Sequence, residues 1–457
     1  MFSKILIANR GEIAVRIIRA ARELGVATVA VYSQADKEAL HTHLADEAVC
    51  IGPARSADSY LNMKNIISAA VATGAEAIHP GFGFLSENSK FATMCEEVGI
   101  KFIGPSGRVM DMMGDKINAR AQMIKAEVPV IPGSDGEVHT AEEALAVADK
   151  IGYPVMLKAS AGGGGKGIRK VSSPDELVPL FESASSEAQA AFGNGAMYME
   201  RVIYPARHIE VQILADQYGH VLHLGERDCS LQRNNQKVLE ESPSIAIGPS
   251  LRQKIGQAAV RAAESVGYEN AGTIEFLYDE KIGEFYFMEM NTRVQVEHPV
   301  TEFVTGVDIV KEQIRIAAGE PLSIQQDDIE IKGHAIECRI NAENPAFNFA
   351  PSPGTISNLY LPSGGVGLRV DSAVYPGYTI PPYYDSMIAK IIVHGDNRFE
   401  ALMKMQRALY ELEIEGVVTN TNFQLDLISD SHVVAGDYDT AYLMEDFLPR
   451  YQEEIQE

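Results

Sequence analysis

The segment KILIANRGEIAVRIIRAARELGVATVAVYS, residues 4–33, predicts a strand, a helix and a second strand. KILIANR and ATVAVYS are short apolar runs, and apolar residues between them recur at helical spacing, at Ile13, Ile17, Ala21 and Leu24. EAVCI, EAIHP and KFIG follow, each separated by a helical pattern. Because strands and helices that alternate form a parallel sheet with right-handed crossovers, we predict a Rossmann-like N-terminal domain.

A second unit begins near Gly114. Thr140 and Glu143 form a capping box at the start of a helix, and the strands YPVMLKA and IRKV follow with a glycine-rich loop between them. From about Pro205 the chain is rich in strands, and its last hundred residues combine Gly/Pro-rich strands with a helix near residues 397–414. We therefore expect an α/β fold, with α+β character in the later parts.

The composition is that of a globular protein with an acidic surface. The chain has 457 residues, of which 46% are hydrophobic and 22% charged, and its formal net charge is −24. This length suggests about three domains. The net charge disfavours non-specific binding to nucleic acid or to an anionic membrane, so an anionic ligand must be bound by a local group of basic residues or backbone N–H groups.

The cysteines and the N-terminus predict a cytoplasmic location. Four cysteines, Cys50, Cys95, Cys229 and Cys338, lie far apart and form no zinc-binding pattern, which is typical of free thiols in a reducing compartment. The first residues do not have the pattern of a signal peptide, and the longest run without charges is interrupted by Pro and Gly. We expect neither a membrane segment nor a structural zinc site.

The loop Gly162-Gly163-Gly164-Gly165-Lys166-Gly167 lies between two predicted strands. A Walker A loop needs Ser or Thr after Gly-Lys, and a Rossmann loop leads directly into a helix, so this loop fits neither pattern. Glycines allow backbone N–H groups to approach a phosphate closely, and Lys158 and Lys116 offer positive charge. The alternatives are a flexible surface loop and ordinary solvated lysines.

The segment Met288 to Glu297 alternates polar and apolar residues. If it is a strand, one face carries Glu289, Asn291, Arg293, Gln295 and Glu297. The preceding hairpin places Glu275 almost opposite Glu289, so that two carboxylates and an amide can meet one divalent cation. Arg293 and Gln295 suit a small oxyanion, with Glu297 beside them as a proton acceptor. The alternative is an ordinary amphipathic strand whose polar face is in water.

A glycine lid, lysines, paired carboxylates and an oxyanion pocket together indicate phosphoryl transfer from ATP to a small carboxylate-like acceptor. The chain resembles the biotin carboxylase family of the ATP-grasp superfamily in its motifs ILIANRGEIAVRIIRAARELG, HPGFGFLSEN, KASAGGGGKG, CSLQRNNQK, GTIEF and MEMNTRVQVEHPVTE. The resemblance extends to about residue 446 and is strongest to the stand-alone biotin carboxylase subunits of bacterial acetyl-CoA carboxylase.

The resemblance implies a set of domains and a reaction. The domains are a Rossmann-like N-terminal domain at 1–113, an ATP-grasp domain at 114–320 with a lid at about 131–204, a C-terminal mixed β domain at 321–446, and a tail at 447–457. In the reaction, ATP phosphorylates bicarbonate to carboxyphosphate, and the carboxyl group passes to N1′ of biotin on a carrier protein. The implied partners are a biotin carboxyl carrier protein, carboxyltransferase subunits and a second copy of the chain, and the pathway leads to malonyl-CoA and fatty acids.

The resemblance also assigns roles to individual residues. Glu297 is the catalytic base, with Arg293, Arg339 and Lys237 as further catalytic residues; Arg293, Gln295, the Val296 backbone and Arg339 bind bicarbonate or biotin. Mg²⁺ or Mn²⁺ is held by Glu275, Glu289 and Asn291. ATP is contacted by Lys116, Lys158, Gly162 to Gly167, Glu200, Ile203, His208, Gln232, Lys237 and Leu277.

Two features of the sequence qualify this resemblance. Many family members read QRRHQK where this chain has Asn234 and Asn235, which puts in doubt any nucleotide contact from these two positions. Met403-Lys404-Met405 imitates a biotin acceptor site, but its surroundings have helical periodicity, so we do not expect biotin on Lys404. Two other functions stay open, a carboxylate–amine ligase without biotin and a non-catalytic nucleotide-binding subunit.

Overall fold

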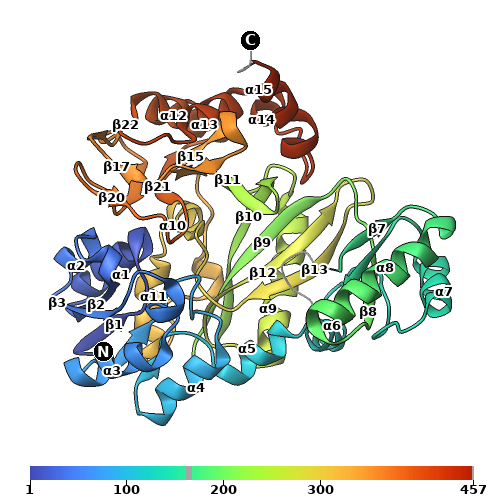
Figure 1. Ribbon diagram of the computed structural model, residues 1–457, viewed down its shortest axis with the longest axis horizontal. Coiled ribbons are helices and arrows are strands. Elements are labelled where there is room, and N and C mark those ends of the chain that lie inside the picture. The colour runs from blue at the N-terminus through green and yellow to red at the C-terminus, as the bar shows by residue number, and fades with distance from the viewer. Residues whose placement is uncertain (161–166, 455–457) are drawn as a thin grey trace.

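The computed structural model describes residues 1–160 and 167–454. Figure 1 shows an N-terminal part at one end of the long axis, a small sheet with two helices at the other end, and a large sheet between them. The C-terminal helices lie above the large sheet in the same view. The mixture of a parallel N-terminal sheet with antiparallel sheets elsewhere confirms the predicted fold class.

The N-terminal part is a parallel sheet in the order β3-β2-β1-β4-β5. Its strands are β1 (Lys4–Ile7), β2 (Ala27–Ser33), β3 (Glu47–Gly52), β4 (Ala77–His79) and β5 (Lys101–Phe102). Its helices are α1 (Gly11–Glu23), α2 (Leu40–Leu44), α3 (Met63–Thr73), α4 (Ser89–Glu97) and α5 (Gly107–Gly114), with 3₁₀ turns at η1 (Gln34–Asp36) and η2 (Ser56–Asp58). The strand, helix and strand predicted over residues 4–33 are therefore confirmed, and the helix buries the apolar side expected from its spacing.

The small sheet has the order β7-β6-β8 and is antiparallel. Its elements are α6 (Lys116–Lys125) before it, then α7 (Ala141–Ile151), β6 (Val155–Ala159), β7 (Arg169–Val171), α8 (Pro174–Phe192) and β8 (Met197–Arg201). The Thr140 hydroxyl accepts the Glu143 backbone N–H at 3.2 Å, so the predicted cap begins α7.

The large sheet has the order β13-β12-β9-β10-β11-β14-β21-β19 and joins residues far apart in the sequence. Its strands are β9 (Arg207–Ala215), β10 (Val221–Arg233), β11 (Gln236–Ser242), β12 (Asn270–Asp279), β13 (Glu284–Asn291), β14 (His334–Asn341), β19 (Leu368–Ser372) and β21 (Met387–Gly395). The helices α9 (Pro249–Val266), α10 (His298–Thr305) and α11 (Ile309–Ala317) pack against it. This sheet positions most of the predicted site residues.

The remaining elements belong to the C-terminal third of the chain. They are β15 (Glu343–Asn344), β16 (Ala350–Pro351), β17 (Gly354–Thr355), β18 (Asn358–Tyr360), β20 (Thr379–Ile380), β22 (Glu413–Glu415), α12 (Arg398–Glu411), α13 (Thr421–Ser429), α14 (Ser431–Ala435), α15 (Leu448–Glu454), 3₁₀ turns η3 (Gln326–Asp328) and η4 (Pro345–Phe347), and a π-helical turn η5 (Leu443–Phe447). Lys404 lies within α12, as its periodicity predicted, and its ammonium bonds the His394 carbonyl at 2.8 Å.

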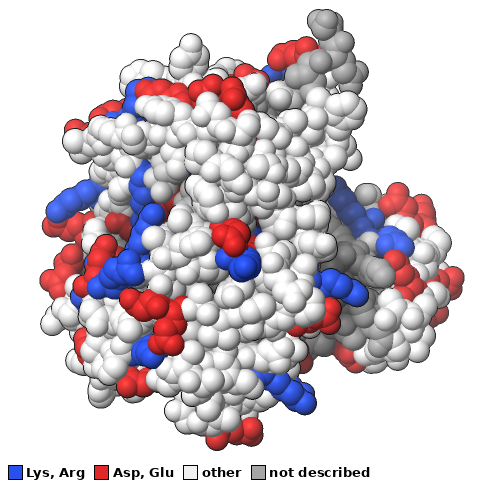
Figure 2. All heavy atoms as spheres, turned by 60° about the vertical axis from the view of Figure 1, so that its left-hand side comes forward, with Lys and Arg blue, Asp and Glu red and all other residues white. Residues whose placement is uncertain are grey.

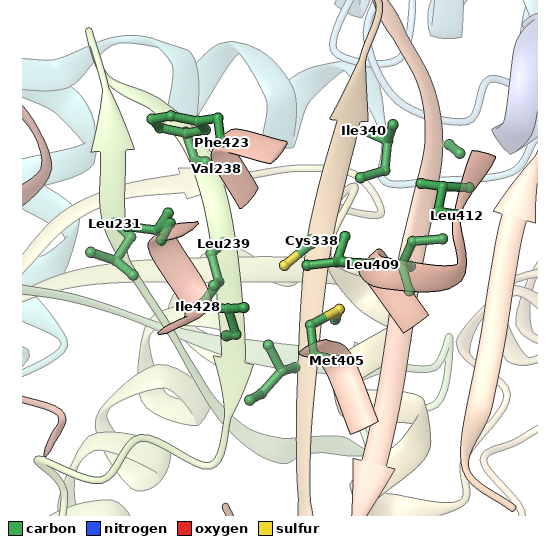
Figure 3. Packing of buried hydrophobic residues seen from close by; sticks show 14 of the residues in the cluster. Leu231, Val238, Leu239, Cys338, Ile340, Met405, Leu409, Leu412, Phe423 and Ile428 are labelled. Atoms are coloured by element: carbon green, nitrogen blue, oxygen red, sulfur yellow. The ribbon is translucent and has the colours of Figure 1, made fainter. Parts of the chain in front are cut away.

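The core of the C-terminal part lies between the large sheet and its helices. Figure 3 shows Leu239 of β11, Cys338 of β14, Met405 of α12 and Phe423 of α13 packed together, and all four are nearly or fully buried. Burying one such apolar side chain contributes about 1.5–3 kcal/mol to stability. This packing fixes β11 and β14 beside each other, and both carry predicted site residues.

The surface carries charges of both signs. On the face shown in Figure 2, Lys and Arg side chains are interspersed with Asp and Glu. The four cysteines all lie in the described part of the chain and are free thiols. Within the described residues, each helix is too short or too polar to cross a membrane.

Buried neutral histidines predict that the fold loses stability in acid. Burial lowers the pKa of His79 to about 3, and burial together with Arg10 lowers the pKa of His41 to about 4 although Asp36 opposes the shift. Each histidine has a pKa of about 6.5 in the unfolded chain, so its stabilising effect is complete above this pH and is lost as the pH falls toward the folded value. Between about pH 7.5 and about pH 5, we expect the free energy of unfolding to fall by about 2 kcal/mol for each of these two histidines.

The substitution His79→Asn tests this, because Asn Oδ1 can accept the Gly81 N–H that His79 Nδ1 now accepts at 3.0 Å. We expect its thermal midpoint to fall less between the two pH values than that of the unaltered protein. His139→Asn is the control, because that side chain is exposed. An equal fall in all three proteins would contradict the prediction.

Candidate active site

A cavity of about 1520 Å³ lies between the N-terminal part, the small sheet and the large sheet. Fifteen of the predicted site residues line it: Lys116, Lys158, Glu200, Ile203, His208, Gln232, Lys237, Glu275, Leu277, Glu289, Asn291, Arg293, Gln295, Val296 and Arg339. Glu297 is fully buried and is joined to this set by hydrogen bonds to Lys237 and Arg339. The structure thus gathers residues that are separated by more than two hundred positions in the sequence.

The predicted glycine loop is described only at its end. Gly162, Gly163, Gly164, Gly165 and Lys166 lie outside the described residues. Gly167 has a φ of +69°, and a Cβ atom there would come within 2.9 Å of the Ala159 Cβ. This position therefore requires glycine for both its backbone conformation and its close approach to β6.

The hairpin of β12 and β13 has the predicted register. Glu275 and Glu289 are directly paired across the two strands, and Asn291 Nδ2 donates to Glu275 Oε1 at 2.8 Å. Burial and the neighbouring Glu275 raise the pKa of Glu289. The pKa of Glu275 is lowered, because Lys237 and His208 outweigh the effect of its burial. Two carboxylates and an amide oxygen are the ligand types that Mg²⁺ and Mn²⁺ prefer.

The strand predicted to continue to Glu297 is too long. β13 ends at Asn291, because Glu87 of the N-terminal part accepts the Thr292 backbone N–H at 3.1 Å and Arg293 Nε at 2.8 Å. Residues 292–297 then form an irregular segment that leads into α10. We call residues 292–297 the connecting segment. Gln295 and Glu297 are nonetheless buried, so the polar side is not the water-exposed face of an ordinary strand.

Arg293 and Gln295 form a small polar group in the connecting segment. Arg293 Nη1 donates to Gln295 Oε1 at 3.1 Å, and its Nη2 donates to Asn291 Oδ1 at 3.1 Å. Within the described residues, the buried Gln295 Nε2 lacks a hydrogen-bond acceptor. A buried donor without a partner is costly, and an oxyanion in the cavity would satisfy it.

Lys237 is the centre of the acidic network. Its Nζ donates to Glu297 Oε1 at 2.6 Å and to Glu275 Oε1 at 3.1 Å, and it also bonds Glu210. These carboxylates raise the pKa of Lys237 well above its usual value although burial acts to lower it. The ammonium therefore remains charged, and it links Glu297, the predicted base, to Glu275 of the predicted metal site.

Glu297 is held in its ionised form. Its Oε2 accepts Arg339 Nη2 at 2.9 Å, while Oε1 accepts Lys237. Burial and Glu210 act to raise the pKa of Glu297, but Lys237, Arg339 and Arg227 outweigh them and lower it. An ionised carboxylate at this position can accept a proton.

The other side of the cavity combines positive charge with an apolar wall. Lys158 of β6 bonds Glu200 of β8, and burial together with Lys116 lowers the pKa of Lys158 to about 8. Ile203 belongs to a buried apolar cluster against which Leu277 packs. His208 Nδ1 and Gln232 Nε2 lie 3.0 Å apart. Lysines suit phosphates, and an apolar wall suits a planar base.

Family comparisons cover almost the whole chain. The family model "Biotin carboxylase, N-terminal domain" matches residues 1–110, "Carbamoyl-phosphate synthase L chain, ATP binding domain" matches 115–325, and "Biotin carboxylase C-terminal domain" matches 337–445. The chain is 58% identical to biotin carboxylase 1 of Bacillus subtilis over 97% of its own length and 98% of that protein. The chain belongs to the biotin carboxylase family.

Other similar proteins are named for different carboxylation reactions. The chain is 56% identical to a pyruvate carboxylase component of Methanothermobacter thermautotrophicus over 97% of its length and 90% of that protein. The biotin carboxylase domain of 2-oxoglutarate carboxylase from Hydrogenobacter thermophilus, a dimer in complex with MgADP, ADP and bicarbonate, superposes with a TM-score of 0.90 at 53% identity. That match covers 97% of this chain and 98% of the other.

The two asparagines that depart from the common pattern of biotin carboxylases form a tight turn. Asn234 and Asn235 join β10 to β11 with φ values of 50° and 64°. A two-residue hairpin loop with both φ values positive is a type I′ turn, which favours Asn. Asn235 lines the cavity, so this position can still face a ligand.

Sequence reasoning missed several residues around the biotin carboxylase site. Glu210 bonds Lys237 and Arg227, Glu240 bonds Arg339 Nε at 2.6 Å, and Glu87 and Lys390 contact the connecting segment. Two of them had a visible signal: Glu210 follows His208 by two in a strand, and Lys390 interrupts an apolar run. Glu87 lies in another part of the chain and its role depends on tertiary contact.

Two groups of possible metal ligands, His208 with Glu210 and Glu275, and Glu210 with Cys229 and Glu297, also lie close together. Lys237 already bonds Glu210, Glu275 and Glu297. Arg227 also bonds Glu210 and Arg339 also bonds Glu297, so that cations already compensate the charge of these two carboxylates, and we assign no second metal to either group.

Proposed function

We propose that this protein is an ATP-dependent biotin carboxylase that uses bicarbonate and carboxylates biotin through carboxyphosphate. The observation that carries the proposal is the buried Glu297 carboxylate, held between Lys237 and Arg339 at the end of the connecting segment. Arg293 and the unsatisfied Gln295 amide lie in the same segment. The Hydrogenobacter relative, described as a complex with MgADP and bicarbonate, supports the choice of ligands.

In the proposed first step, Arg293, Gln295 and the Val296 backbone hold bicarbonate. Glu297 accepts its proton, and the bicarbonate oxygen attacks the γ-phosphorus of ATP, so that ADP leaves and carboxyphosphate forms. Lys116, Lys158 and Lys237 stabilise the charge on the phosphates, together with the lid residues Gly162 to Gly167. Ile203 and Leu277 provide the apolar wall for the adenine ring of ATP. Glu200, His208 and Gln232 complete the nucleotide site.

In the second step, carboxyphosphate breaks its C–O bond and transfers its carboxyl group to N1′ of biotin, with loss of phosphate. Arg339 stabilises the enolate form of biotin, because its guanidinium is fixed by Glu240 and Glu297 and lines the cavity. The phosphate released at this point can accept the biotin proton.

We propose Glu275, Glu289 and Asn291 as the residues that hold Mg²⁺ or Mn²⁺. Their oxygens and the raised pKa of Glu289 beside Glu275 fit a site that gains from a divalent cation. A bound ion would neutralise charge on the ATP phosphates.

The test is ATP hydrolysis measured with and without bicarbonate and free biotin. We expect hydrolysis to require bicarbonate and to rise when biotin is added. Hydrolysis that is indifferent to both bicarbonate and biotin would favour a carboxylate–amine ligase, and nucleotide binding without hydrolysis would favour a regulatory subunit. Either result would overturn the proposed function.

We further propose that the chain serves the first half-reaction of acetyl-CoA carboxylase, toward malonyl-CoA and fatty acids. Its partners would be a biotin carboxyl carrier protein, carboxyltransferase subunits and a second copy of itself. The dimer described for the Hydrogenobacter domain supports the second copy. The Bacillus relative, 98% of whose length this chain matches, supports a carboxylase that is separate from its carrier and carboxyltransferase. Relatives named for pyruvate and 2-oxoglutarate carboxylation show that the acceptor is not determined by this chain's family alone.

We also propose the division into residues 1–113, 114–320 with a lid at about 131–204, 321–446 and a tail at 447–457. The ranges matched by the three family models support it. The pairing of β11 with β14 joins the second and third of these domains in one sheet. A cytoplasmic location stays a prediction.

A further inference from the structure

The connecting segment carries four residues of the proposed bicarbonate site, and side chains from other parts of the chain hold its backbone. The Gln295 carbonyl accepts a hydrogen bond from His298 Nδ1 at 2.8 Å. The Val296 carbonyl accepts one from Lys390 Nζ at 2.7 Å. These two carbonyls belong to consecutive peptide groups. The first peptide carries the Val296 N–H and the second links Val296 to Glu297.

Lys390 reaches Val296 from β21 of the C-terminal part. Its side chain is fully buried. Its Nζ lies 3.3 Å from Glu12 Oε1 of α1 and 3.9 Å from Asp371 Oδ2 of β19. The Lys390 ammonium therefore connects helix α1, strand β19 of the large sheet and the connecting segment.

The ammonium is charged in the folded protein. Burial acts to lower the pKa of Lys390, but Glu12, Glu337 and Asp371 outweigh burial and raise it. A charged donor bonds a carbonyl more strongly than a neutral one, and the bond is stronger still where water is excluded. The Val296–Glu297 peptide is therefore held more firmly than a surface loop would be.

We infer that Lys390 is a positioning residue for the bicarbonate site, fixing the peptide between the Val296 backbone and the Glu297 base. This inference rests on the proposed function. A shift of about 1 Å in a reacting group can lower a rate by about a hundredfold. Because the connecting segment is proposed to bind bicarbonate, loss of the hydrogen bond between Lys390 and Val296 should affect the use of bicarbonate more than the binding of ATP. Lys390 acts on the Val296 carbonyl and has no direct role in proton transfer.

The test compares Lys390→Met with the double variant Lys390→Met/Glu12→Gln and the single variant Glu12→Gln. Methionine keeps the length and apolar character of the stem but removes the ammonium. The double variant also removes a carboxylate that would otherwise be left unpaired, so it serves if the single lysine variant does not fold. Glu12→Gln keeps the hydrogen bond from Lys390 to the Val296 carbonyl. It is the control for loss of the ion pair between Lys390 and Glu12.

Two measurements separate positioning from a general loss of stability. The first is the KM for bicarbonate and for MgATP in ATP hydrolysis with free biotin. In the double variant we expect the bicarbonate KM to rise about tenfold or more relative to Glu12→Gln, with the MgATP KM within about twofold. The second is hydrogen exchange of the backbone amides of residues 294–298, which should be faster in the double variant than in Glu12→Gln.

Equal bicarbonate KM values and equal exchange in the double variant and Glu12→Gln would overturn the inference. If the unaltered protein does not hydrolyse ATP in response to bicarbonate, the proposed function fails. The exchange measurement then still decides whether Lys390 fixes the connecting segment, because it does not depend on activity.

Discussion

Replacing Glu297 with Gln is expected to lower the rate of biotin carboxylation by about 10²- to 10⁴-fold, the range typical of a general base. Gln has the shape of Glu but cannot accept the bicarbonate proton. The carboxylate that it replaces is fully buried and bonded by Lys237 at 2.6 Å and by Arg339 at 2.9 Å. MgATP affinity should change by no more than about threefold, because Glu297 itself is not among the residues proposed to contact the nucleotide.

The measurements are steady-state carboxylation of free biotin and equilibrium binding of MgATP. Glu226→Gln is a matched control, since Glu226 is also buried but bonds Arg252 at 2.8 Å, whereas Glu297 bonds the site residues Lys237 and Arg339. We expect it to keep most of the activity. A Glu297→Gln protein that carboxylates biotin at nearly the unaltered rate would show that the base is another group.

Replacing Lys237 with Met is expected to damage both catalysis and stability. The ammonium lies among the carboxylates of Glu210, Glu275 and Glu297, and its loss leaves them to repel one another in a buried site. Breaking a buried charge network by removing one member costs about 3–5 kcal/mol. The turnover number should fall by more than about a hundredfold, because a cation near the phosphates and the base is also lost.

Thermal unfolding and steady-state ATP hydrolysis with bicarbonate measure the two effects. Lys311→Met is the control, because Lys311 pairs with Glu23 at 2.6 Å in a partly exposed pair outside the cavity. Surface pairs contribute only about 0–1 kcal/mol, so this variant should resemble the unaltered protein. A Lys237→Met protein as stable and as active as Lys311→Met would contradict the role given to Lys237.

The pKa values of the acidic network connect the roles of Glu297 and Lys237. Glu297 and Glu275 have lowered pKa values because cations surround them, although their burial acts in the other direction. Lys237 contributes to both shifts. The same ammonium therefore keeps the base ionised and holds it in place.

The register of the β12–β13 hairpin could be predicted from the sequence, because a short turn and period-two alternation fix which residues face each other. Glu275 and Glu289 are paired as expected. The end of β13 could not be predicted, since the alternation continues to Glu297 while the backbone N–H of Thr292 bonds Glu87 from another part of the chain. Local periodicity does not report such a competing acceptor.

Local sequence patterns were enough to predict the alternating elements of the N-terminal sheet, the capped helix α7 and the acidic face of the hairpin, because these depend on neighbours a few residues apart. The folded chain was needed to show that Glu210, Lys237, Glu297 and Arg339 form one charged network, and that Lys390 reaches the connecting segment. These contacts join strands that lie together in the large sheet but are distant in the chain. Side-chain charges in a buried site interact through space, and the order of residues alone does not specify which of them will meet.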